Sequence, residues 1–268
     1  SPFAFTGNRF EFRAVGSSAN CAASIIALDA AVAHQLNEFR KEVDGLIAKG
    51  KGKDEAIFQV LKKLIVESKA VRFEGDGYSD EWKKEAAKRG LTNITSAPEA
   101  IGKYLDKSSK EVLIGEKIFN EIELHGRVEV EYEKFSKKVQ IESRTLGDIA
   151  LNHIVPTAVA YQNRLIENLC GLKQLFSEAE YDELSEDRKD LIREISLHVT
   201  AIKKLLKRMT EERRTANTSG SEEEKAIIYD KVVRPTMEEI RTHIDALELV
   251  IDDDIWPLPK YRELLFAK

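Results

Sequence analysis

Three charged side chains stand at alternate positions near the start of the sequence, with aromatic residues between them. They are Arg9, Glu11 and Arg13, separated by Phe10 and Phe12. A period of two is typical of a β-strand, so the charged side chains should lie side by side on one face. A carboxylate can bind a hard divalent cation, and guanidinium groups beside it can hold phosphate oxygens. This combination suits phosphoryl transfer, although the spacing alone also fits a solvated strand face with exchangeable ion pairs.

The strand that presents these side chains is expected over residues 9–15, and no other segment convincingly predicts a strand. A single strand leaves its backbone donors and acceptors unpaired, so it should join a sheet supplied from outside this chain. Magnesium takes several oxygen ligands, whereas this segment offers one carboxylate. We therefore expect the chain by itself to be catalytically inactive and to bind neither metal nor nucleotide tightly.

Most of the remaining sequence has the apolar periodicity of helices. Ser17, Ser18 and Asn20 can cap a helix over residues 21–48, whose apolar residues recur at steps of three and four. Further short helices are expected over residues 54–71, over 80–89 with Gly90 at its end, and from a capping box that begins at Ser96.

Two larger helical features follow. The pattern over residues 118–176 stays helical but contains Pro156, which lacks a backbone donor, so a kink is expected there. Residues 180–251 carry two apolar stripes with an average period of 3.5, separated by the polar stretch 217–221, and should form an antiparallel hairpin. The predicted fold class is mainly α: a helical bundle with a long kinked helix and a helical hairpin, plus one N-terminal strand.

The composition limits the classes of partner. The chain has 268 residues with 47 acidic and 42 basic side chains, which are mixed along the sequence and give a formal net charge of -5. No basic face is therefore offered to nucleic acid or to an anionic membrane. No run of about 18 apolar residues predicts a membrane span. Cys21 and Cys170 lie in helical stretches without neighbouring metal ligands, which fits a reducing, cytoplasmic setting.

Other chemically suggestive groups have simpler interpretations. The stretch 49–53, rich in glycine and lysine, lacks the residues of a P-loop and is expected to be a linker. The three adjacent aspartates at 252–254 do not converge on a cation in a regular backbone. The five histidines are scattered over different helices and have no nucleophile beside them in the sequence, so structural or surface roles are expected. Any role of Gly75-Asp76-Gly77-Tyr78 beyond that of a turn stays open.

Several stretches of the sequence together resemble one enzyme family. Residues 5–13 read FTGNRFEFR and precede Ser17-Ser18-Ala19-Asn20 and an alanine-rich helix. This order is similar to the last catalytic strand of glutamine synthetases and the helix after it. The resemblance narrows to the type III branch at Gly75-Asp76-Gly77-Tyr78, at residues 141–154 (IESRTLGDIALNHI) and at the ending WPLPKYR over 256–262. It covers essentially the whole chain, but only the C-terminal portion of the family.

The resemblance implies ATP-dependent ligation of ammonia to the side-chain carboxylate of glutamate through an acyl-phosphate. Glu11 would bind Mg2+ or Mn2+ on the nucleotide side, and Arg9 would contact the ATP phosphates. Arg13 would be catalytic, stabilising the transferring phosphoryl group, and Asn8 would support these residues. The partners would be glutamate, ammonia and ATP, and the dodecamers of the family imply a homo-oligomer.

The resemblance also implies how the chain is divided. Residues 1–50, with strand 9–15 and helix 21–48, would be the C-terminal remnant of an α+β catalytic domain. Residues 51–268 would be the helical type III C-terminal region, used for subunit assembly. Because residue 1 is serine and the first residues are apolar, we expect a cut, engineered or proteolytic, inside a longer protein. The alternative is a freestanding helical scaffold that binds partners through its hairpin and adds its strand to a partner's sheet.

Overall fold

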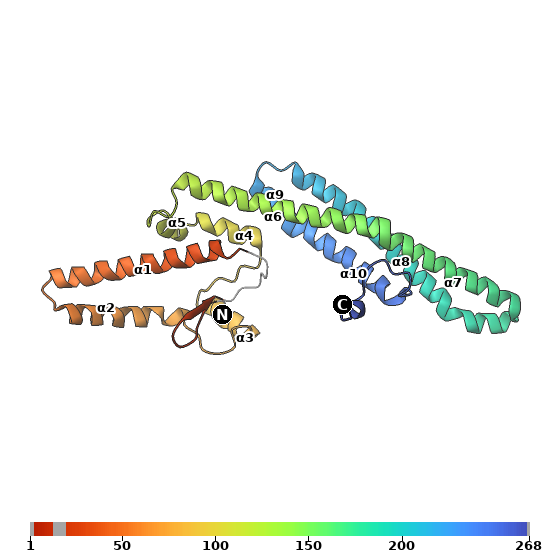
Figure 1. The fold of residues 1–268 in the computed structure, drawn as a ribbon, viewed down its shortest axis with the longest axis horizontal. Coiled ribbons are helices and arrows are strands. Elements are labelled where there is room, and N and C mark those ends of the chain that lie inside the picture. The colour runs from red at the N-terminus through yellow and green to blue at the C-terminus, as the bar shows by residue number, and fades with distance from the viewer. Residues whose placement is uncertain (1–2, 13–19, 267–268) are drawn as a thin grey trace. The chain divides into compact units, whose positions relative to one another are not determined.

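The computed structural model describes residues 3–12 and 20–266 and is mainly α-helical, as the sequence predicts (Figure 1). The chain divides into two compact units, Ser1–Val128 and Glu129–Lys268. Within the described ranges, no helix combines the length and the apolar character needed to cross a membrane. The boundary expected at residue 50, between a catalytic remnant and a helical region, stays a prediction.

A β-hairpin opens the first unit. Strands β1 (Phe3–Phe5) and β2 (Phe10–Phe12) pair antiparallel, with Ala4 opposite Glu11. The expectation that the charged strand has no partner in this chain is therefore wrong, because the segment directly before it supplies one. Residues 13–15 of the expected strand lie outside the described residues.

The turn between the two strands is held by its backbone. The N–H of Thr6 donates to the carbonyl oxygen of Arg9 at 2.9 Å, and the Thr6 hydroxyl donates to the same oxygen at 3.3 Å. Gly7 has φ 100°, a left-handed conformation that glycine adopts without the steric cost of a Cβ. These contacts place Arg9 at the end of the turn, immediately before β2.

A pair of antiparallel helices follows the hairpin. Helix α1 (Ala22–Ala48) corresponds to the helix expected over 21–48. Its N-cap residue is Cys21, and Asn20, one of the predicted caps, lies one residue earlier, where its Oδ1 accepts from the N–H of Ala22 at 2.8 Å. Helix α2 (Lys53–Glu67) continues into a 3-10 turn, η1 (Ser68–Val71), which together fill the range expected as one helix. The small core between α1 and α2 contains Val43, Ala56 and Val60.

Short helices complete the first unit. Ser79 caps the start of α3 with its side-chain oxygen, and Gly90 follows the end of that helix with φ 76°. Ser96 caps α4 in the same way, as predicted. The bounds are Asp80–Lys88 for α3, Ala97–Gly102 for α4, Lys103–Leu105 for the 3-10 turn η2 and Lys107–Leu113 for α5.

The long interrupted helix predicted from the sequence is confirmed. Helix α6 (Glu121–Ile149) begins in the first unit and continues into the second, where a π-helical turn, η3 (Ala150–Ile154), joins it to α7 (Val155–Leu175). Pro156 is the second residue of α7. Its missing N–H and bulky ring disturb the turn before it, and the wider π turn absorbs that disturbance.

The same arrangement occurs once more in the second unit. A π turn, η4 (Tyr229–Val233), lies between α9 (Glu222–Ile228) and α10 (Arg234–Val250), and Pro235 is the second residue of α10. This interruption was not predicted from the sequence. The interruption does not break the apolar stripe of the helical hairpin. Tyr229 in η4 is buried, and the chain stays helical on both sides of the π turn, so the stripe continues into α10.

The expected helical hairpin forms the core of the second unit. Helix α8 (Glu178–Asn217) packs against α7 on one side and α10 on another (Figure 1). Ile195, Ile202 and Met209, spaced by seven residues on α8, are almost fully buried. Each such side chain contributes roughly 1.5–3 kcal/mol by leaving water. A last short helix, α11, spans Tyr261–Leu264.

Candidate functional site

The β-hairpin of β1 and β2 brings together two of the three charged residues that the sequence singles out. Arg9 Nη2 lies 3.2 Å from Glu11 Oε1, on the same face of the hairpin. The Arg9 side chain is 72% exposed and that of Glu11 is 32% exposed, so the carboxylate is the more buried group of the pair. Arg13, the predicted catalytic residue, lies outside the described residues.

The chemistry available to this pair depends on groups from elsewhere. Among the described residues, no group of three or more His, Cys, Asp or Glu side chains is placed to hold a metal ion. Glu11 would therefore supply one oxygen donor to a divalent cation, and the other ligands would come from outside this part of the chain. A guanidinium next to that carboxylate is suited to a phosphate oxygen shared with the cation. The residues present thus fit a metal–nucleotide complex in part.

Another carboxylate in the first unit has a structural role. Glu116, after α5, accepts from Asn37 Nδ2 at 2.7 Å through Oε2, and its Oε1 lies 2.9 Å from His34 Nδ1. Both partners are on α1. These contacts fasten α1, the helix after the strand, to the end of α5, and they agree with the structural role expected for the histidines.

Two of the five histidines meet in the second unit, a contact that was not predicted from the sequence. His198 Nδ1 of α8 lies 2.9 Å from His243 Nδ1 of α10. Burial lowers the pKa of His243, and the nearby His198 lowers it further. The signal was present in the spacing, because His198 and His243 each follow a buried isoleucine, Ile195 and Ile240, by three residues on the facing stripes.

An open hollow of about 410 Å³ lies in the first unit between α1, η2 and α5. Its walls are mainly apolar, and the polar groups at its edge come from Lys103, Ser108 and Ser109. Lys103 is already paired with Asp106 at 3.0 Å. The hollow therefore offers an apolar surface without convergent charged groups, and it carries no catalytic chemistry of its own. The remaining lining residues are Ala27, Ala100, Tyr104, Val112 and Leu113.

Comparison with known proteins shows which family the chain is similar to. Residues 56–173 match the glutamine synthetase C-terminal domain. The relatives of the chain are glutamine synthetases as well. It is 65% identical over all 268 residues to a glutamine synthetase of Bacteroides fragilis (strain YCH46), of which it covers 37%. It is 33% identical over its whole length to the type-3 glutamine synthetase of Dictyostelium discoideum, of which it covers 36%.

The resemblance to glutamine synthetases expected from the sequence is thus confirmed. A third relative, a glutamine synthetase of Butyrivibrio fibrisolvens, is 29% identical over the whole chain, which spans 37% of it. The chain therefore spans little more than a third of the proteins it matches. Arg9 and Glu11 precede the region matched by the C-terminal domain, so their roles stay predictions.

Proposed function

We propose that this chain is the C-terminal part of a type III glutamine synthetase. The complete enzyme would transfer the γ-phosphoryl group of ATP to the side-chain carboxylate of glutamate, and ammonia would then displace phosphate to give glutamine. The observation that carries this proposal is the 65% identity to a glutamine synthetase along all 268 residues. A match of that extent favours an enzyme part over a freestanding helical scaffold.

The N-terminal β-hairpin would form one wall of the active site. In this proposal Glu11 binds Mg2+ or Mn2+, Arg9 contacts the ATP phosphates, and Arg13 stabilises the transferring phosphoryl group. The 3.2 Å contact between Arg9 and Glu11 supports the first two roles, because it puts a cation ligand and a phosphate donor within one short span. The remaining metal ligands would come from the rest of the enzyme, so the chain alone would be inactive.

The helical region after residue 50 would serve subunit assembly in a homo-oligomer, a dodecamer by the resemblance, in the cytoplasm. Apolar side chains left in contact with water on α1 and α2 support a further contact surface. Val32 is 54% exposed, Leu36 is 62% exposed and Phe58 is 68% exposed. Val32 and Leu36 lie four residues apart and therefore on one side of α1. Exposed apolar groups of this kind mark surfaces that other protein covers.

The test is a charge-removing substitution in the complete enzyme. Glu11→Gln keeps the shape and a hydrogen-bonding side chain but removes the charge that binds the cation, so glutamine formation should fall roughly 10- to 100-fold or more. Glu131→Gln is the matched control, because Glu131 is a half-exposed carboxylate on α6, remote in sequence from the proposed strand, that pairs with Lys134 at 2.8 Å. Near-normal activity of Glu11→Gln, with an unchanged requirement for divalent metal, would overturn the assignment.

A further inference from the structure

Two histidines at the contact between α8 and α10 turn the same ring nitrogen toward each other. His198 Nδ1 is 2.9 Å from His243 Nδ1, and the centres of the two rings are 5.1 Å apart with their planes at 60°. Both residues are half-buried, so solvent reaches the pair at one side. Neutral imidazole nitrogens are the ligands that zinc, nickel and copper ions take readily from proteins.

The separation of the two nitrogens suits a metal ion shared between them. Imidazole nitrogens bind Zn2+ at about 2.0–2.1 Å, so two of them on one ion lie about 2.8 to 3.4 Å apart, according to whether the angle at the ion is square or tetrahedral. The observed 2.9 Å falls within that range. A rotation of the rings would therefore aim both lone pairs at one ion without a movement of the helices.

The buried stripes of the two helices hold the histidines in place. Ile195 and Ile202 lie three residues before and four residues after His198, and both are 0% exposed. Ile240, three residues before His243, is equally buried. The backbone at each histidine is thus fixed by the core, and ligands fixed in this way lose little freedom when an ion binds.

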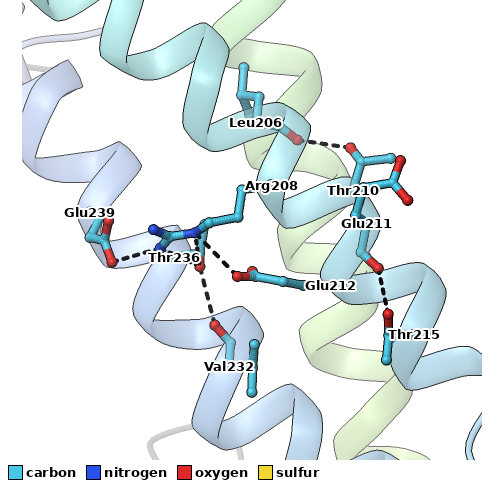
Figure 2. A network of polar contacts seen from close by, with 9 residues as sticks. All are labelled: Leu206, Arg208, Thr210, Glu211, Glu212, Thr215, Val232, Thr236 and Glu239. Carbon is cyan, nitrogen blue, oxygen red and sulfur yellow. Dashed lines mark hydrogen bonds and ion pairs between the residues drawn. The ribbon is translucent and has the colours of Figure 1, made fainter.

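A network of polar contacts further along the same two helices fixes their register. Figure 2 shows Arg208 of α8 reaching α10, with its Nη2 2.7 Å from Glu239 Oε1 and 2.8 Å from the hydroxyl of Thr236. Its Nε lies 3.2 Å from Glu212 Oε1 on its own helix. Glu239 precedes His243 by one helical turn, but its carboxylate is engaged by Arg208. The histidine pair therefore keeps its position and gains no ligand from that side.

The carboxylate of Glu194 favours the tautomer of His198 that can bind an ion. Glu194 precedes His198 by one helical turn, and its Oε1 is 3.9 Å from His198 Nε2. A negative charge there favours a proton on Nε2, which leaves the Nδ1 lone pair facing His243. The proton between the rings then belongs to His243 Nδ1. When an ion binds, this proton moves to Nε2 of the same ring, and both Nδ1 atoms become ligands.

We propose that His198 and His243 bind a divalent ion of the zinc and nickel type through their Nδ1 atoms, and that this ion links α8 to α10. Within the described part of the chain, no group of three or more His, Cys, Asp or Glu side chains is placed to hold a metal, so water would fill the other positions. The ion would therefore exchange with solvent. Imidazole ligands favour such ions over Mg2+, which takes oxygen ligands. The site does not depend on the function proposed above.

The test uses the chain as it exists, with the chlorides of Zn2+, Ni2+ and Mg2+ as separate probes. Calorimetric titration should show saturable binding of Zn2+ or Ni2+, and the same ion should raise the temperature of thermal unfolding, because it binds the folded chain. Mg2+ should give neither effect. Nuclear magnetic resonance of the imidazole nitrogens should show that two of the five histidines change together as the ion is added.

His198→Asn and His243→Asn should each weaken the binding roughly tenfold or more, because a single imidazole lacks the gain from two linked ligands. His153→Asn is the matched control, since it makes the same change at an exposed histidine on η3, and it should bind the ion as the native chain does. The resonance titration needs no variant, so it decides the matter even if one of them unfolds. The proposal is wrong if neither Zn2+ nor Ni2+ binds saturably, or if His198→Asn or His243→Asn binds as tightly as His153→Asn.

Discussion

The Nδ1 atoms of His198 and His243 lie 2.9 Å apart across the contact between α8 and α10. A hydrogen bond between two imidazoles needs one nitrogen that donates and one that accepts, so the two rings cannot both be protonated while it persists. Nearby carboxylates offset the cost of protonating this pair only in part. His198 Nε2 is 3.9 Å from Glu194 Oε1. Glu239 raises the pKa of His243, but by less than burial and His198 lower it. The contact between the arms of the hairpin therefore depends on pH.

Acidification should destabilise the chain through this pair. Because the pKa of His243 is lowered in the folded state, the unfolded chain binds more protons below the ordinary value of 6.5. The free energy of unfolding should therefore be insensitive to this group above that pH and decrease as the pH falls below it. Urea unfolding at about pH 7.5 and about pH 5.5 measures the difference. His243→Asn should reduce it, and His153→Asn, at an exposed position on η3, should not.

Removing side-chain volume from the core of the helical hairpin should lower the free energy of unfolding far more than removing it from the surface. Ile202 on α8 is 0% exposed, so Ile202→Ala should lower the free energy of unfolding by about 2–5 kcal/mol. Leu197 on the same helix is 72% exposed, and Leu197→Ala should change it by about 0.5 kcal/mol or less. Chemical denaturation of both variants tests the assignment of the two faces of α8. Similar losses for both would contradict it.

The helical parts of the fold could be predicted because each repeats a local pattern. Residues such as Ile195, Ile202 and Met209 recur on one face of α8, and that recurrence identifies both the helix and its buried side. Caps are equally local, which is why Ser96 begins a helix and Gly90 follows the end of another as expected. Proline marks the interruption at Pro156, but the form of the interruption, a π turn, depends on packing that the sequence pattern does not show.

Other features could not be predicted because they depend on register between distant segments. Strand β1 has three residues, Phe3–Phe5, which is too short for alternation to identify. Contacts such as His198 with His243 join helices whose relative register only the folded chain fixes. In the candidate site, the contact between Arg9 and Glu11 agrees with the expectation that they lie side by side, although Arg9 lies in the turn before β2 and not on the strand expected over 9–15.

The phenol of Tyr132 should ionise at unusually high pH. Burial raises the pKa of Tyr132 to about 12, and the carboxylates of Glu223 and Glu129 contribute in the same direction. Since the folded state favours the protonated phenol, this group stabilises the chain fully below its ordinary value of 10.0 and loses that effect as the pH rises to about 12. Ultraviolet titration of native chain and Tyr132→Phe isolates the signal. If Tyr132→Phe instead removes a phenol that titrates at the ordinary value of 10.0, the burial of Tyr132 is contradicted.

Two glycines with open space around them should respond to alanine in opposite directions. Gly90 has φ 76°, so Gly90→Ala should destabilise the chain by about 1–2 kcal/mol, because an L side chain is strained in that conformation. Gly45 lies within α1, and a methyl group added there would meet no atom within 4 Å, so Gly45→Ala should stabilise by about 0.5–1 kcal/mol. Thermal unfolding of the two variants gives the signs. Equal shifts would contradict the left-handed backbone conformation of Gly90.

The two arginines of the proposed active-site strand should fail in different ways when each is replaced by lysine in the complete enzyme. Lysine keeps the charge but loses the planar fork. If Arg13 acts on the transferring phosphoryl group, Arg13→Lys should lower kcat roughly 100-fold with little change in KM for ATP. If Arg9 holds ATP phosphates in the ground state, Arg9→Lys should raise KM for ATP roughly tenfold and leave kcat nearly unchanged.

A matched control is Arg241→Lys, because Arg241 is 69% exposed on α10 and paired only with Asp245 at 3.4 Å. Steady-state kinetics with ATP varied at saturating glutamate and ammonia separate kcat from KM. The Arg9 measurement also tests the contact seen in the hairpin, since Glu11 Oε1 would lose its 3.2 Å partner. A loss of kcat confined to Arg9→Lys would reverse the two assignments, and unchanged kinetics in both variants would exclude the strand from the active site.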